Sequence, residues 1–260
     1  MIRGSNHFYN LDLSIGSSVD QIAEIIDEER PEWIFHYAAI NGTQYFYDIP
    51  GKVLEVNSLT TYYLMKAVKI VKEKDHLFQT KIVYSSSSEV YGEPFHLPSC
   101  EQDITYVNVE HNRDSYAAAK LLGEFYVRLF SEEMGMEWMN LRFFNVYGPK
   151  MVGTKYGQVI PEFITRLKEG EYPLRIYGNW DHRRSFCYVD DNVRDTAALA
   201  LKEGTRGVFN IGNPDEISIR ELGSCIMEKM GKKPAFEFLP EREGDHKRRC
   251  PDTSRLQAVI

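Results

Sequence analysis

Residues 81–92 read Lys81-Ile82-Val83-Tyr84-Ser85-Ser86-Ser87-Ser88-Glu89-Val90-Tyr91-Gly92. The stretch begins as a short apolar run with β-branched side chains, which predicts a buried strand. Four serines follow at once, so hydroxyl groups collect at the carboxyl end of this strand. Open α/β sheets bind their ligands at that end of their strands. A serine-rich turn is the alternative interpretation.

The neighbouring segments alternate between helical and strand patterns. Ile22, Ile25 and Ile26 have helical spacing and predict a helix at residues 19–29, and further amphipathic helices are predicted at residues 52–72 and 115–134. Apolar runs predict strands at residues 33–37, 81–84 and 137–144. This alternation is typical of a doubly wound parallel α/β sheet.

The pattern loosens after Pro149 but does not disappear. Ser218 with Glu221 three residues later predicts a capping box that opens a helix at residues 219–230. The other elements expected in this half are helices at residues 156–170 and 189–201 and strands at residues 174–177 and 207–211.

Composition excludes several classes of protein. The chain has 260 residues, 43% of them hydrophobic, which is enough for a sizeable core, and no apolar run is long enough to cross a membrane. A net charge of −7 argues against a nucleic-acid partner. The sequence has no signal peptide, and its four cysteines are scattered without metal-ligand spacing. We therefore expect a cytoplasmic protein with reduced thiols and no bound metal.

Tyr116 and Lys120 lie four residues apart within a predicted helix. Residues at this spacing share one helix face, so the ammonium group would lie beside the phenol and favour its ionised form. A phenol tuned in this way is a proton-transfer group. The alternative is an ordinary pair on a solvated face.

Three motifs in this order carry a family resemblance. They are Ser86-Ser87-Ser88-Glu89-Val90-Tyr91-Gly92, Tyr116-x-x-x-Lys120 and Leu141-Arg142-Phe143-Phe144-Asn145-Val146-Tyr147-Gly148-Pro149. The chain resembles the extended short-chain dehydrogenase/reductase superfamily, namely its NAD-dependent nucleotide-sugar epimerases, dehydratases and decarboxylases. The resemblance implies a Rossmann-like domain at residues 1–148 and a smaller substrate domain at residues 149–260. Part of residues 184–212 would return to the first domain.

The amino-terminal end departs from the family pattern. Such proteins open with a strand, a Gly-x-x-Gly-x-x-Gly turn and a helix that holds the cofactor pyrophosphate. Gly4 and Gly16 have no glycine partners at that spacing, and residues 1–10 are too few for such a unit. We expect an N-terminally truncated sheet, either because the chain is a fragment starting about 50 residues late or because it binds dinucleotide poorly.

The resemblance implies a mechanism that begins with oxidation of the sugar at C4 by NAD. Tyr116 would take the proton of the C4 hydroxyl, Ser87 would hydrogen-bond that hydroxyl, and Lys120 would hold the nicotinamide ribose and lower the pKa of Tyr116. The positions implied to contact NAD are Asp12, Leu13, Ala38, Ala39, Asn57, Tyr116, Lys120 and Phe143.

The implied partner is a nucleotide-diphosphate sugar. Guanidinium groups suit diphosphate oxygens, which fits the arginines of the second half, although a solvated face is the alternative for Lys247 and Arg248. The positions implied to contact substrate are Ser87, Asn145, Val159, Tyr177, Arg184, Arg242, Asp245 and Arg249.

Glu89 ranks the outcomes that remain open: epimerase, 4,6-dehydratase or uronate decarboxylase. Its place matches an active-site carboxylate of dehydratases and decarboxylases, and it is the fourth implied catalytic residue beside Ser87, Tyr116 and Lys120. Ser88 counts against a glucose-type dehydratase, and Arg249 with Glu89 favours a decarboxylase. A catalytically silent nucleotide-sugar-binding homologue or partner subunit is the alternative. A hydroxysteroid-type reductase would leave Arg184 and Arg242 unexplained.

The resemblance also implies a homodimer. Residues 52–72 and 115–134 would pack against their copies as a four-helix bundle. The apolar side chains that motivate this prediction are Tyr62, Met65, Leu122, Phe125, Tyr126 and Leu129. They would otherwise cover only their own sheet.

Overall fold

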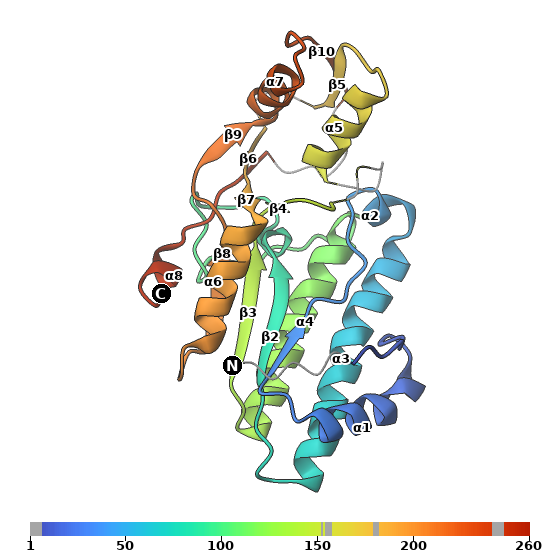
Figure 1. Ribbon diagram of the computed structural model, residues 1–260, viewed down its shortest axis with the longest axis vertical. Coiled ribbons are helices and arrows are strands. Elements are labelled where there is room, and N and C mark those ends of the chain that lie inside the picture. Colours follow the sequence, from blue (N-terminus) through green and yellow to red (C-terminus); the bar gives the residue numbers. More distant parts are fainter. Residues whose placement is uncertain (1–6, 152, 154–157, 179–181, 241–246) are drawn as a thin grey trace.

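The computed structural model describes residues 7–151, 153, 158–178, 182–240 and 247–260. Its centre is a four-stranded parallel sheet in the order β1-β2-β3-β8 (Figure 1). The strands are β1 (Trp33–His36), β2 (Lys81–Ser87), β3 (Trp138–Phe143) and β8 (Gly207–Ile211). The predicted α/β, Rossmann-like parallel sheet is confirmed. β2 is longer than expected, because the strand continues through the first three serines.

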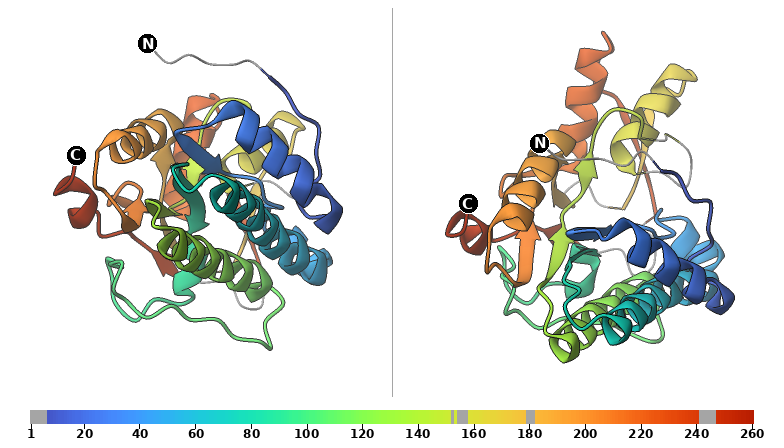
Figure 2. Two further views of the ribbon diagram at one scale, coloured as in Figure 1. Left: turned by 90° about the horizontal axis from the view of Figure 1, so that it is seen from below. Right: turned by 60° about the horizontal axis from the view of Figure 1, so that its bottom comes forward.

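Helices cover both faces of this sheet, as Figure 2 shows. One face packs against α1 (Val19–Glu29), α3 (Pro50–Lys74) and α4 (Asp114–Met134). The other packs against α6 (Val189–Leu201) and the short α8 (Ser254–Gln257). Gly123 lets α4 approach β2 closely, since a Cβ there would overlap the hydroxyl of Tyr84. Strands covered on both faces are apolar along their length, which is why residues 81–84 and 138–141 lack alternation.

A smaller unit lies at the top of Figure 1, beyond the carboxyl ends of the sheet. It consists of α5 (Val159–Lys168), α7 (Ile219–Lys229) and the parallel pair β5 (Leu174–Tyr177) and β10 (Phe236–Leu239), which share one apolar core. The predicted capping box of Ser218 and Glu221 opens α7. The predicted domain boundaries stay a prediction.

Short strands connect the two parts. β6 (Arg183–Ser185) pairs with β9 (Glu216–Ser218) and β11 (Arg248–Arg249), and β4 (Val146–Tyr147) pairs with β7 (Cys187–Tyr188). The sequence patterns predict none of these strands, nor β10, α8 or α2 (Tyr45–Asp48). They also miss the single 3-10 turns η1 (Gly16–Ser18) and η2 (Ser88–Tyr91). Strands of two or three residues are too short for side-chain alternation to be recognised, whereas β10 has four residues, as many as the predicted β5, and was simply missed.

Several boundaries differ from expectation, most of them by one or two residues. The helix predicted at residues 156–170 is α5, Val159–Lys168, and residues 156–157 lie outside the described residues. α3 begins at Pro50, which suits the first turn of a helix because its missing N–H has no intrahelical acceptor there. Across the described residues, no helix is long and apolar enough to cross a membrane. In the same part of the chain the four cysteines are free thiols.

Candidate active site

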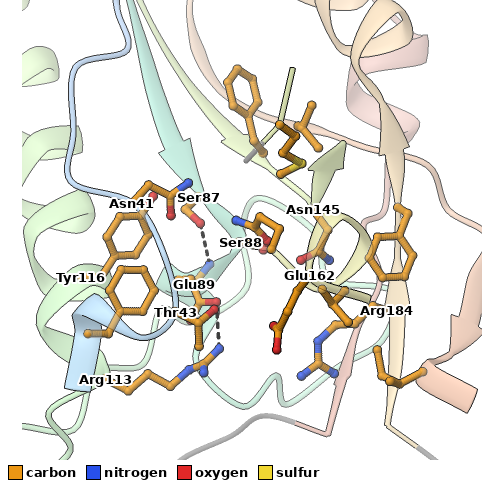
Figure 3. A pocket seen from close by; sticks show the side chains of 18 of the residues that line it. Asn41, Thr43, Ser87, Ser88, Glu89, Arg113, Tyr116, Asn145, Glu162 and Arg184 are labelled. Carbon is orange, nitrogen blue, oxygen red and sulfur yellow. Dashed lines mark hydrogen bonds and ion pairs between the residues drawn. The ribbon is translucent and has the colours of Figure 1, made fainter. Parts of the chain in front are cut away.

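A cavity of about 400 Å³ lies between the carboxyl ends of the sheet strands and the smaller unit. The loop after β1 contributes Ala39, the end of β2 contributes Ser85–Ser88, and the end of β3 contributes Phe143. Parallel strands end at one edge of a sheet, and for this reason residues distant in sequence meet here. The opposite wall includes Glu162 of α5, in the smaller unit, and Arg184 of the connecting strand β6, and Figure 3 shows both across the cavity from Tyr116.

Tyr116 and Lys120 line this cavity from one face of α4, as their spacing predicts. The Lys120 Nζ lies 5.7 Å from the centroid of the Tyr116 ring and donates a hydrogen bond to the Ser85 carbonyl at 2.6 Å. Phe46 of α2 stacks on the Tyr116 ring with 4.4 Å between centroids. Both Tyr116 and Lys120 are buried, so packing fixes the positions of their side chains beside the cavity.

The pKa values of this pair correct one expectation. Burial raises the pKa of Tyr116, the negative charge of Glu89 raises it further, and a hydrogen bond with Ser87 opposes both effects. Burial lowers the pKa of Lys120 to about 7, against an opposing effect of Glu124. The expected lowering of the Tyr116 pKa by Lys120 is therefore wrong for the described chain. Desolvation disfavours the charged form of both groups and is the largest effect on each.

Lys120→Met should stabilise the fold most at acidic pH. The pKa of Lys120 is about 7 in the folded chain and 10.5 ordinarily. Between these pH values the unfolded chain therefore binds one proton more than the folded chain. Stability contributed by this site therefore rises as pH increases from about 7 to about 10. We expect a gain of about 2 kcal/mol at pH 6, reduced because the Ser85 carbonyl loses its donor, and a smaller gain at pH 9.

Urea unfolding of Lys120→Met at pH 6 and pH 9 measures this difference. Lys66→Met on the exposed face of α3 is the matched control and should change stability by less than about 0.5 kcal/mol at either pH. A gain that is larger at pH 9 than at pH 6 would contradict the predicted sign.

Glu89 is held by two arginines. Its carboxylate pairs with Arg113, at 3.1 Å from Nη2 to Oε1, and with Arg249, whose Nη2 lies 2.8 Å from Oε2 and whose Nη1 contacts Oε1. The Glu89 backbone N–H donates to the Ser87 hydroxyl at 3.2 Å, which fixes the turn after β2. Exposed side-chain fractions are 16% for Glu89, 6% for Arg113 and 3% for Arg249. A buried carboxylate with two guanidinium partners keeps a defined orientation.

A second buried ion pair lies behind this site. Arg142 of β3 donates to both carboxylate oxygens of Glu124, at 2.9 Å from Nε and 2.8 Å from Nη2. The Ser86 hydroxyl donates to the same carboxylate at 2.5 Å. Glu124 follows Lys120 by one helical turn, so the pair connects α4, β2 and β3 directly beneath the catalytic residues.

The positions expected to contact NAD divide into two groups. Ala39, Tyr116, Lys120 and Phe143 line the cavity, whereas Asp12, Leu13, Ala38 and Asn57 do not. Asn57 is buried and bonds both the N–H and the carbonyl of Ile40, so it holds the loop after β1 in place. The Asp12 carboxylate accepts bonds from the N–H and hydroxyl of Ser14. Leu13 packs against the core beside α1.

The side chains present fit a nicotinamide ribose. Ala39 leaves room on one wall, Phe143 offers an apolar surface, and the buried Nζ of Lys120 already binds a carbonyl oxygen with hydrogen-bond geometry. An ammonium group in this position is a suitable donor for ribose hydroxyls. NAD contacts at the other expected positions stay a prediction.

The positions expected to contact substrate converge from both parts of the chain. Ser87, Asn145, Val159, Tyr177 and Arg184 line the cavity. Arg249 is not among its lining residues but reaches Glu89 from behind, and Arg242 and Asp245 lie outside the described residues.

Asn145 adopts a positive φ of 38°. Asparagine tolerates this conformation better than most residues. Its amide donates to the Ser185 carbonyl at 2.8 Å, so it joins the end of β3 to β6.

Several residues that line the cavity were not predicted from the sequence: Asn41, Thr43, Phe46, Arg113, Glu162 and Arg166. Arg113 had a usable signal, because it precedes Tyr116 by three residues and so shares its helix face. Glu162 and Arg166 also have helical spacing, but nothing local to α5 shows that this face borders the cavity.

Known proteins resemble this chain in sequence and in fold. A family model described as the NAD dependent epimerase/dehydratase family matches residues 2–212. UDP-glucuronic acid decarboxylase 1 of Xenopus tropicalis is 30% identical over 228 residues, which cover 87% of this chain and 52% of the decarboxylase. The chain thus spans about half the length of the curated relatives it matches.

Solved structures with this fold include nucleotide-sugar complexes. UDP-glucose 4-epimerase of Thermotoga maritima with UDP-glucose matches with a TM-score of 0.83 and 27% identity, over 96% of this chain and 77% of the epimerase. MoeE5 in complex with UDP-glucuronic acid and NAD matches with a TM-score of 0.81 and 26% identity, over 97% of this chain and 78% of MoeE5.

Proposed function

This chain belongs to the NAD-dependent epimerase/dehydratase family, and from that premise we propose that it decarboxylates a nucleotide-diphosphate uronate through a 4-keto intermediate. The observation that carries the proposal is the pairing of Glu89 with both Arg113 and Arg249 beside Tyr116. The similarity to a UDP-glucuronic acid decarboxylase supports the same outcome and makes UDP the first nucleotide to test.

The residues of the chain supply binding and proton transfer. A bound NAD would supply hydride acceptance at C4 of the sugar and the later return of a hydride. Tyr116 takes the proton of the C4 hydroxyl, Ser87 aligns that hydroxyl, and Lys120 binds the nicotinamide ribose. Arg184 on the opposite wall suits the diphosphate, because its guanidinium group matches phosphate oxygens.

The pairing of Glu89 favours decarboxylation over 4,6-dehydration. A dehydratase needs a base that removes the C5 proton. Protonating Glu89 would weaken its ion pairs with Arg113 and Arg249, so it is a poor base where it lies. Decarboxylation needs no such base: the bond between C5 and the carboxyl carbon breaks, its electron pair moves toward the C4 carbonyl, CO₂ leaves, and C5 takes up one proton.

A uronate 4-epimerase is the second candidate. It is favoured by the match to MoeE5 in its complex with UDP-glucuronic acid and by the match to UDP-glucose 4-epimerase. An epimerase would turn the keto sugar over and reduce it on the other face. That step needs no group that assists loss of CO₂.

Glu89→Gln separates these outcomes in the NAD-loaded protein that carries this chain. With UDP-glucuronate, we expect the variant to reduce NAD normally, because hydride transfer depends on Ser87, Tyr116 and Lys120. Product formation should fall by about 10²-fold or more, the usual cost of misplacing groups at a reacting centre, because Glu89 holds both guanidinium groups beside the departing carboxyl group. Single-turnover NADH absorbance and NMR of the product measure the two steps.

Glu132→Gln, an exposed carboxylate of α4, is the matched control. Unimpaired product formation by Glu89→Gln would transfer the proposal to the 4-epimerase. Binding of UDP-glucuronate without any NADH signal in the unmodified protein would identify the silent binding homologue instead.

We also propose a homodimer through α3 and α4. Leu122, Phe125 and Leu129 are 39%, 47% and 50% exposed on one side of α4, although Met65 is fully buried in its own core and contributes nothing to such an interface. Exposed apolar rows of this kind motivate association. Light scattering should give twice the chain mass, and Phe125→Asp with Leu129→Asp should give the monomer mass. A monomer mass for the unsubstituted protein would reject the dimer.

Cytoplasmic location stays a prediction.

A further inference from the structure

Resting on the proposed function, we infer that Arg113 binds the carboxylate of the substrate uronate, and that the substrate displaces Glu89 from Arg113 while Arg249 keeps hold of Glu89. The three residues therefore have separate tasks. Arg113 determines specificity. Glu89 pairs with Arg113 when no substrate is bound, and Arg249 anchors Glu89.

The positions of the two arginines support this division. Arg113 lines the cavity and extends from the start of α4 toward Glu89, as Figure 3 shows. It shares a helix face with Tyr116, whose phenol marks where the C4 hydroxyl must lie. Arg249 is not among the lining residues and is 3% exposed, so Glu89 separates it from the cavity. A carboxylate entering the cavity thus meets Arg113 before Arg249.

The charges that line the cavity are the physical reason for this role of Arg113. Glu89 lines the cavity beside Tyr116 and repels a uronate carboxylate unless a cation faces it, whereas Glu162 on the opposite wall is already paired with Arg166 at 3.2 Å. The Arg113 guanidinium now binds Oε1 of Glu89 at 3.1 Å, and a carboxylate is the group that it would bind in substrate. Exchanging one carboxylate for another conserves the charge-assisted hydrogen bond. Glu89 keeps its 2.8 Å bond from Arg249 through Oε2 during this exchange.

Selectivity for uronates follows from the exchange. A neutral hexose carries a hydroxymethyl group where the uronate has its carboxylate. That group cannot replace Glu89 on Arg113 without leaving a buried guanidinium short of a charged partner. The arrangement should therefore bind UDP-glucuronate more tightly than UDP-glucose, although both share the nucleotide and most of the sugar.

The test must distinguish binding of substrate from simple positioning of Glu89. In a Glu89→Gln background, Arg113 has no Glu89 charge to hold, and any effect of replacing it on uronate affinity reports contact with substrate. Calorimetry with NADH-loaded protein avoids oxidation of the sugar during the measurement. Arg113→Gln in this background should weaken UDP-glucuronate by about 30-fold or more and UDP-glucose by less than about 3-fold.

Three further variants complete the experiment. Arg113→Lys should show an intermediate loss for UDP-glucuronate, because a charge remains but the planar fork is gone. Arg249→Gln in the same background should affect the two sugars equally, and Arg128→Gln on the exposed face of α4 should change neither affinity. Circular dichroism checks that each variant is folded.

Equal losses for the two sugars on Arg113→Gln, or a selective loss on Arg249→Gln in its place, would overturn the inference while the proposed function stands. Failure of the unmodified protein to bind or convert either nucleotide sugar would overturn the proposed function itself. These two results are distinguishable, because the second is seen before any substitution is made.

Discussion

Tyr116→Phe should lower kcat for oxidation of the nucleotide sugar by about 10²-fold or more, with little change in KM. The variant removes the proton acceptor for the C4 hydroxyl and keeps the ring. That ring stacks on Phe46 at 4.4 Å and is buried, so its packing and the cavity shape are retained. Steady-state rates with UDP-glucuronate and single-turnover NADH absorbance measure the effect.

Tyr126→Phe is the matched control, since Tyr126 lies on the same helix and contacts the rings of Tyr62 and Phe130 away from the cavity. It should leave kcat unchanged. The unmodified protein should oxidise sugar faster as pH rises, because burial and Glu89 raise the pKa of the phenol that must ionise. A loss below tenfold on Tyr116→Phe would remove Tyr116 from the catalytic role.

Arg142→Met should destabilise the fold by about 3–5 kcal/mol, the usual cost of leaving a buried charge unpaired. The variant keeps the apolar length of the side chain and removes both hydrogen bonds to Glu124, whose side chain is 7% exposed. Burial lowers the pKa of Arg142, but its pairing with Glu124 raises it by more. The cost therefore belongs to the pair and not to the arginine alone.

Urea unfolding of the double variant Glu124→Met with Arg142→Met supplies the control. It should recover much of the lost stability, because no buried charge remains. Arg128→Met, which breaks the exposed pair with Glu132, should cost less than about 1 kcal/mol. Equal costs for Arg142→Met and Arg128→Met would contradict the assignment of a structural ion pair beneath the site.

The helices and strands that the sequence predicts best are the ones with a periodic pattern of apolar residues. α1, α6, β5 and β8 have the predicted bounds, because each shows a clear helical or strand pattern over its whole length. β6, β7 and β11 have two or three residues each, and their pairing is decided by partners elsewhere in the chain. No local pattern contains that information.

The site divides in the same way. Ser87, Glu89, Tyr116 and Lys120 share one cavity, as the order of motifs predicts. The partners of Glu89 could not be derived locally, since Arg249 follows it by 160 residues. The direction of the Tyr116 pKa shift was also wrong, because spacing shows which groups are neighbours but not how deeply both are buried. Desolvation is a property of the packed structure.

The cluster of Glu89, Arg113 and Arg249 constrains how this sequence can change during evolution. Glu89 depends on Arg113, 24 residues away, and on Arg249, 160 residues away, so one carboxylate ties together three stretches that otherwise mutate independently. Losing Glu89 would leave two buried cations in mutual repulsion. Losing either arginine would remove one of the two cations that pair with the Glu89 carboxylate. Among homologues, these positions should change together or not at all, and lineages that abandon acidic sugars should lose Arg113 and Glu89 as a set.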